Sequence, residues 1–65
     1  MKNFIEFTVY ESKQRILIDI NDIRCIAEQN NYTCKLYFFS DTKLSEVINL
    51  TYDEVIERLK KAKLN

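Results

Sequence analysis

The chain has 65 residues, 46% of them hydrophobic and 31% charged, and its ten basic residues balance ten acidic ones. This composition is typical of one small globular domain over residues 1–65 and excludes a disordered chain. The neutral charge argues against nucleic acid as the main partner, because phosphate contacts call for a basic excess. The absence of glycine excludes phosphate-binding loops of the Walker and dinucleotide types, which need close approach of the backbone.

The first half of the chain predicts three strands. Apolar residues alternate along residues 4–10, and β-branched residues are frequent in residues 15–20, and both patterns are typical of strands. The polar residues 11–14 predict a loop between them. Residues 21–23 predict a corner or a single helical turn, because Asn and Asp bond to their own backbone. Residues 24–28 predict the third strand.

The second half predicts two more strands around an asparagine turn. Asparagine tolerates positive φ, so Asn30-Asn31 can replace Asn-Gly in a tight hairpin. The fourth strand is predicted over the aromatic residues 32–39 and the fifth over residues 44–49, with a turn between them. We therefore expect an α+β fold whose antiparallel sheet has about five strands in a meander, which either stays open or curls.

A C-terminal helix is predicted to pack on one face of this sheet. Thr51 and Glu54 match a capping box, and Leu50 and Val55 are placed to form a hydrophobic staple. A single helical stripe carries the apolar side chains of Tyr52, Val55, Ile56, Leu59 and Ala62. An isolated helix of this length is not stable in water, so the stripe must pack on the sheet.

No catalytic, cofactor-binding or metal-binding residue is predicted. The chain lacks histidine, which excludes a Cys–His nucleophile, and two cysteines nine residues apart do not make a zinc site. Capping and solvation explain the acidic residues beside turns and at the helix start, which are Asp19, Asp22, Asp53 and Glu54. A sheet with one helix offers little room for a pocket that shifts a carboxyl pKa. We expect a protein that is not an enzyme.

Cys25 and Cys34 lie on the strands at either side of the asparagine turn. No apolar run is long enough to cross a membrane, and Glu6 stands where a signal peptide would have its apolar core. A cytoplasmic location with reduced thiols is therefore expected, and both thiols are expected to be buried or half-buried. A cross-strand disulfide is the alternative, although its geometry across neighbouring strands is often strained.

Both faces of the predicted sheet are apolar. One face, with Phe7 and Leu36, can pack under the helix. The opposite face carries five large side chains: Phe4, Tyr10, Leu17, Tyr37 and Phe39. One helix cannot cover two faces, so either the sheet curls on itself or the second face meets a partner.

Two family resemblances accompany these patterns. Ile-Leu-Ile-Asp-Ile-Asn-Asp-Ile at residues 16–23 and Tyr-Asp-Glu-Val-Ile-Glu-Arg-Leu at residues 52–59 resemble the small bacterial proteins of the flagellar-operon FlbD type, and short bacterial and phage proteins of the same layout. That resemblance implies a small sheet-plus-helix module, although residues 40–42 replace the Asn-Gly or Asp-Gly of those proteins. Residues 20–36 are similar to the start of the LytTR DNA-binding domain, which implies a shared β-hairpin.

The leading hypothesis is a non-enzymatic module that self-associates or binds another protein, with Tyr10, Tyr37 and Phe39 as anchors, because aromatic side chains dominate interface energetics. No membrane partner is expected. A nucleic-acid-binding regulator is the first alternative, with a patch of Lys13, Arg15, Arg24, Lys35 and Tyr32. A small ligand bound between subunits of an oligomer is the second.

Overall fold

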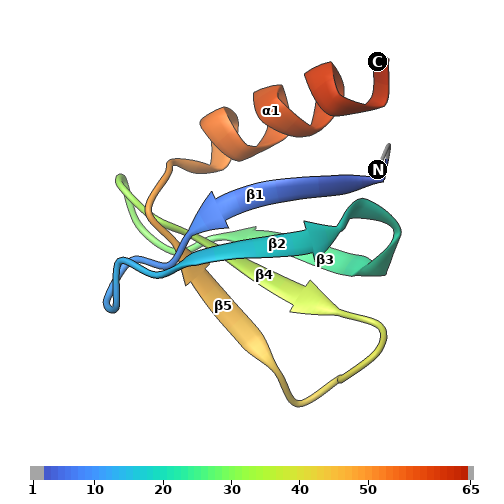
Figure 1. The fold of residues 1–65 in the computed structure, drawn as a ribbon. Helices are drawn as coiled ribbons and strands as arrows, with labels where there is room; N and C mark the ends of the chain where they lie inside the picture. Colours follow the sequence, from blue (N-terminus) through green and yellow to red (C-terminus); the bar gives the residue numbers. More distant parts are fainter. Residues whose placement is uncertain (1–2, 65) are drawn as a thin grey trace.

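The computed structural model describes residues 3–64 and is an α+β fold of five antiparallel strands, one 3₁₀ turn and one helix (Figure 1). In chain order the elements are β1 (Phe4–Thr8), β2 (Arg15–Asp19), the 3₁₀ turn η1 (Ile20–Asp22), β3 (Ile23–Glu28), β4 (Cys34–Phe38), β5 (Ser45–Ile48) and α1 (Tyr52–Leu64). The predicted fold class and the predicted order of strands and helix are confirmed.

The strands divide into two sheets, because the meander curls. β1 and β2 form a hairpin, and β3, β4 and β5 form a three-stranded sheet in that order. A bridge between Val9 and Ile48 joins the two sheets at one end. Beside it, the Tyr10 N–H donates to the Val47 carbonyl at 2.8 Å and the Asn49 N–H donates to the Thr8 carbonyl at 2.9 Å.

The core lies where the inner faces of the two sheets and the helix meet. Alternation along each strand sends every second side chain inward, and the buried apolar set draws on both sheets and on α1: Phe7, Ile18, Cys34, Leu36, Phe38, Ile48, Val55 and Leu59. The curl therefore covers the same face that the helix covers. It leaves the outer faces of both sheets open, so curling does not bury the second apolar face.

The helix begins as predicted from its capping box. The Glu54 N–H donates to Thr51 Oγ1 at 3.1 Å, and the Thr51 N–H donates to Glu54 Oε1 at 2.9 Å. Figure 1 shows α1 alongside β1, on the side away from β2. There Arg58 Nη1 donates to the Glu6 carbonyl at 3.2 Å, and its guanidinium lies 5.7 Å from the centre of the Phe7 ring. Arg58 thus attaches the helix to β1.

The predicted corner after β2 is the 3₁₀ turn η1. Asp19 caps it, because its carboxylate accepts from the Asn21 N–H at 2.9 Å. Asp22 ends it and accepts from Ser40 through both the N–H, at 2.8 Å, and the hydroxyl, at 2.6 Å. These acidic residues act as caps and turn partners, which is the role that the sequence predicted for them.

The asparagine turn differs from its prediction. β3 ends at Glu28 and β4 begins at Cys34, so the connection is longer than a tight hairpin. Asn30 acts through its side chain, whose Oδ1 accepts from the N–H groups of Tyr32 and Thr33. Among residues 3–64, the non-glycine residue with positive φ is Lys13, at 61°. The expected left-handed turn at Asn30-Asn31 is therefore wrong, because a side-chain acceptor organises this loop.

Candidate interaction surfaces

Phe4 and Leu17 stand together on the outer face of the β1–β2 hairpin. Leu17 is paired with Glu6, and Phe4 is paired with Asp19, so the two apolar side chains are diagonal neighbours across the hairpin. Their exposed fractions are 41% for Phe4 and 56% for Leu17. Two of the five predicted interface residues are therefore brought together, and both remain open to solvent.

Tyr37 lies on the outer face of the three-stranded sheet, opposite Cys25 and Ser45. The Arg24 guanidinium and the Lys35 ammonium lie 5.6 and 5.7 Å from its ring centre. A break in the pairing register between Ile23 and Cys25 gives Arg24 its position, from which Nε donates to the Phe38 carbonyl at 3.4 Å. The half-buried Tyr37 thus belongs to a mixed aromatic and cationic cluster rather than to the Phe4–Leu17 pair.

Tyr10 and Phe39 stand at chain turns, outside the strands. Tyr10 follows β1, and the Lys13 ammonium lies 4.9 Å from its ring centre. Phe39 follows β4, is 61% exposed, and donates its N–H to the Asp22 carbonyl at 2.9 Å. The sequence placed both residues in strands; the structure ends β1 at Thr8 and β4 at Phe38. The five predicted residues are therefore spread over several sites.

The predicted nucleic-acid patch is also divided. Lys13 lies in the β1–β2 loop, Arg15 begins β2, and Arg24 and Lys35 flank Tyr37. Tyr32 is 76% exposed in the β3–β4 loop. Arg24 and Lys35 lie beside the same Tyr37 ring, whereas the other three residues lie on other elements.

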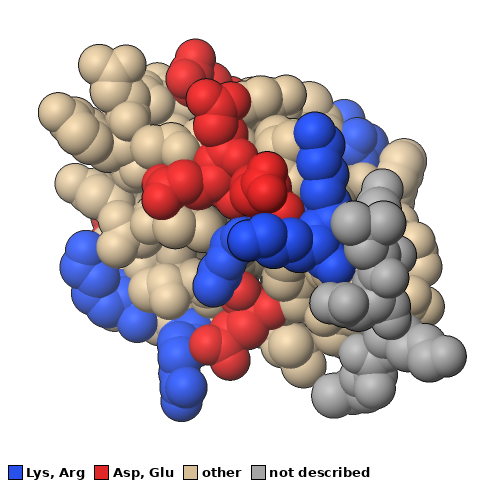
Figure 2. Space-filling view, turned by 90° about the horizontal axis from the view of Figure 1, so that it is seen from above, with Lys and Arg blue, Asp and Glu red and all other residues tan. Residues whose placement is uncertain are grey.

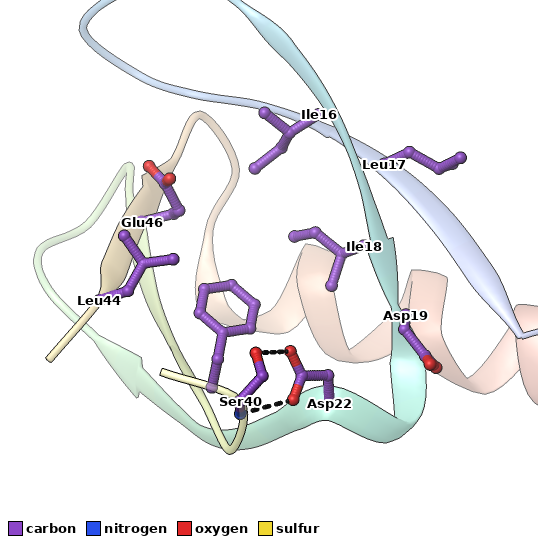
Figure 3. Close-up of a pocket in the computed structure, with 9 residues that line it drawn as sticks. Ile16, Leu17, Ile18, Asp19, Asp22, Ser40, Leu44 and Glu46 are labelled. Atoms are coloured by element: carbon purple, nitrogen blue, oxygen red, sulfur yellow. Dashed lines mark hydrogen bonds between the residues drawn. The ribbon is translucent and has the colours of Figure 1, made fainter. Parts of the chain in front are cut away.

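A groove that the sequence did not predict runs beside β2 (Figure 3). It encloses about 230 Å³ between β2, the η1 corner and the β4–β5 hairpin. Ile16, Ile18, Phe38 and Leu44 supply its apolar lining. Asp22, Ser40 and Glu46 supply its polar lining. No local signal in the sequence marks the groove, because it forms only when the sheet curls.

The helix presents a charged surface. Figure 2 looks down on the side of the molecule that carries α1, where acidic and basic side chains gather in adjoining areas. Asp53 and Glu54 stand in the first turn, and Arg58, Lys60 and Lys61 follow later in the helix. Such alternation of charge is typical of a solvated helix face. The large exposed apolar side chains of the described residues lie on the strands and loops instead.

The two cysteines lie in different environments, and both are free. Cys25 is exposed and pairs with Tyr37 on the outer face, whereas Cys34 is buried and pairs with Glu28 and Ile48. Burial raises the pKa of the Cys34 thiol above its ordinary value, and the charge of Glu28 adds to this. The cross-strand disulfide considered from the sequence is therefore absent, because the side chains are not opposed.

Among the residues that the structure describes, no three His, Cys, Asp or Glu side chains are grouped so that they would hold a metal ion. Within the same residues, no helix has the length and apolar character needed to cross a membrane. The fold defines the chain as a small curled antiparallel sheet with a C-terminal helix. The chain matches no protein-family model, no curated protein and no solved structure. The resemblances to FlbD-type and LytTR proteins stay predictions.

Proposed function

We propose that this protein is a non-catalytic interaction module that binds another protein chain through the outer face and free edge of its β1–β2 hairpin. The observation that carries the proposal is that Phe4 and Leu17 are exposed on a hairpin whose strand β2 pairs with β1 alone among the described strands. An unpaired strand edge is a template for another chain, and adjoining apolar side chains supply the contact area.

The competing explanation is that Phe4 and Leu17 are ordinary scattered surface residues, which single exposed apolar side chains usually are. Two features favour an interface. The two side chains are diagonal neighbours rather than isolated, and Leu17 belongs to the strand that borders the groove of about 230 Å³. A binding protein therefore meets side chains, backbone donors and acceptors, and a groove within one small region.

A pull-down from cells that naturally produce the chain tests this function. Tagged wild type is compared with Leu17→Ser, which removes an exposed side chain, and with Tyr32→Ser, which removes one in the distant β3–β4 loop. We expect wild type and Tyr32→Ser to capture the same binding partner, which is either a different protein or an untagged copy of this chain. We expect Leu17→Ser to lose that partner. Retention that does not depend on Leu17 would contradict the proposal.

A nucleic-acid-binding role is the second candidate, and the cluster of Arg24, Tyr37 and Lys35 favours it. Cations track phosphates and an aromatic ring stacks on bases in proteins that bind single strands. Fluorescence anisotropy with a labelled single-stranded oligonucleotide at low salt tests this role. Binding that weakens with salt and with Arg24→Gln, but not with Lys43→Gln in the β4–β5 turn, would support it. No change in anisotropy at low salt would exclude it.

A further inference from the structure

The free backbone edge of β2 points to a specific partner for the surface proposed above. The Val9 N–H donates to the Gln14 carbonyl at 2.8 Å, and the Ile20 N–H donates to the Asn3 carbonyl at 2.6 Å. Hydrogen-bonded positions alternate along an antiparallel hairpin. The backbone N–H and C=O groups of every second residue from Gln14 to Ile20 therefore face β1. The intervening residues direct their N–H and C=O groups away from β1; they are Arg15, Leu17 and Asp19.

The side chains of β2 alternate between the groove and the outer face of the hairpin. In Figure 3, Ile16 and Ile18 point into the groove, whereas the side chains of Leu17 and Asp19 point away from it. The groove therefore lies on the inner face of β2. Within the described residues β2 pairs with β1 alone, so its other edge has no paired strand.

The β2 edge lacks several of the protections that natural sheet edges carry. Edges are usually blunted by proline, by a bulge, by inward-pointing charges or by a covering helix. The chain has no proline, the irregularity in pairing lies in β3 at Arg24, and α1 lies along β1 (Figure 1). The inward side chains of β2 are the apolar Ile16 and Ile18. This edge is therefore open to another strand.

We infer that β2 pairs antiparallel with β2 of a second copy, about a twofold axis at Leu17; this rests on the function proposed above. Leu17 then lies opposite the partner's Leu17, and Arg15 lies opposite the partner's Asp19. The backbone N–H and C=O groups of all these residues face the free edge, so each pair exchanges two main-chain hydrogen bonds. The pairing is isologous, because each copy offers the same strand.

Charge selects this register over its neighbours. Arg15 and Asp19 stand at equal distances on either side of Leu17, so pairing centred on Leu17 sets opposite charges across both ends. Pairing centred on Arg15 or on Asp19 sets like charges opposite each other, which destabilises an antiparallel pair. A slip by one residue turns the inward side chains outward. The sequence of β2 is thus self-complementary in one register.

The dimer has one continuous sheet in the order β1, β2, β2, β1. Its outer face carries Phe4 and Leu17 from both copies, and the four side chains form one apolar area. On the inner face, Ile16 lies beside the partner's Ile18. The contact is small in comparison with permanent dimers, so we expect a concentration-dependent equilibrium between monomer and dimer.

Sedimentation velocity of purified protein over a range of concentrations tests the pairing through charge reversal. Arg15→Asp alone and Asp19→Arg alone each set like charges opposite each other, so each is expected to remain monomeric where wild type dimerises. An equal mixture of the two variants restores opposite charges at both ends and is expected to dimerise. Asp19 also caps η1, so circular dichroism of each variant is recorded to check that it folds.

A second pair of variants decides the outcome even if charge reversal affects folding. Leu17→Lys sets two like charges at the twofold axis and is expected to abolish the dimer, whereas Tyr32→Lys, the same change at an exposed site in the β3–β4 loop, is expected to keep it. A monomeric wild type at all concentrations, or a dimer that survives Leu17→Lys, overturns the inference. Leu17-dependent capture of a different protein in the pull-down would then still support the broader function.

Discussion

Asp22 and Ser40 are joined by two hydrogen bonds: the carboxylate of Asp22 accepts from the Ser40 N–H at 2.8 Å and from the Ser40 hydroxyl at 2.6 Å. The first residue ends the corner between the two sheets, and the second lies in the β4–β5 connection. The Asp22 carbonyl also accepts from the Phe39 N–H at 2.9 Å. The corner is therefore held to the far end of β4.

Removing this link should destabilise the fold. Asp22→Ala is expected to lower the free energy of unfolding by about 1–2 kcal/mol, because hydrogen bonds to a charged acceptor contribute more than neutral ones. Ser40→Ala keeps the backbone bond and should cost less, about 1 kcal/mol. Urea unfolding at neutral pH measures both. Thr42→Ala, in the neighbouring turn, is the control; equal losses in all three variants would contradict the assigned role.

The capping box predicts a dependence of stability on pH. The backbone N–H of Thr51, and then its side chain, lower the pKa of Glu54 below its ordinary value near 4.5. The ionised carboxylate is thus favoured in the folded state. Its stabilisation is fully present above the ordinary pKa and is lost as the pH falls through the lowered folded pKa.

Glu54→Gln should therefore differ from wild type most above the ordinary pKa of Glu54 and progressively less on acidification. Urea unfolding from neutral pH down to pH about 3, below the usual range of glutamate, follows this difference. Glu57→Gln changes the same charge outside the capping box and controls for net charge. Identical pH profiles for the two variants would show that the cap is not the cause.

The two thiols should differ strongly in reactivity. Cys25 is exposed, whereas Cys34 is fully buried and burial raises its pKa. The thiolate is the reactive species, so modification by a disulfide reagent should show a fast phase from Cys25 and a slow one from Cys34. Cys25→Ser should remove the fast phase alone, and denaturant should merge the two. A fast phase that persists in Cys25→Ser would refute the buried position.

Thr33 offers a route to a more stable protein. Its side chain is 2% exposed, and its Oγ1 has no hydrogen-bond partner among the described residues. An unpaired buried hydroxyl costs free energy, so Thr33→Val, which keeps the shape, should raise the free energy of unfolding by about 1 kcal/mol. Thermal unfolding compares it with Thr42→Val at an exposed site. A loss of stability in Thr33→Val would indicate a bond to Oγ1.

Local features of the fold were predictable from the sequence because neighbouring residues determine them. The capping box at Thr51 and Glu54 and the alternation around Phe7 and Leu36 each lie within one short segment, and the structure confirms them. The corner at residues 21–23 was predicted for the same reason. Its 3₁₀ turn begins one residue earlier, at Ile20.

Features that depend on distant residues were not predictable in the same way. The way in which the two sheets close on each other depends on the Val9–Ile48 bridge, and the groove depends on the approach of β2 to Leu44 and Glu46. The expected burial of both thiols is correct for Cys34 and wrong for Cys25, because β4 directs Cys34 inward whereas β3 directs Cys25 outward. The pairing register, which no local pattern encodes, decides such contacts.

The Val9–Ile48 bridge has a consequence for how the chain folds. It joins β1, near the start of the chain, to β5, near its end, whereas the other strand pairings link neighbours in the sequence. The entropy of closing a loop must be paid before a distant contact is gained. We therefore expect the β1–β2 hairpin and the three-stranded sheet to form early and their closure to set the rate. Substitutions at Val9 should then slow refolding more than equally destabilising ones within either sheet.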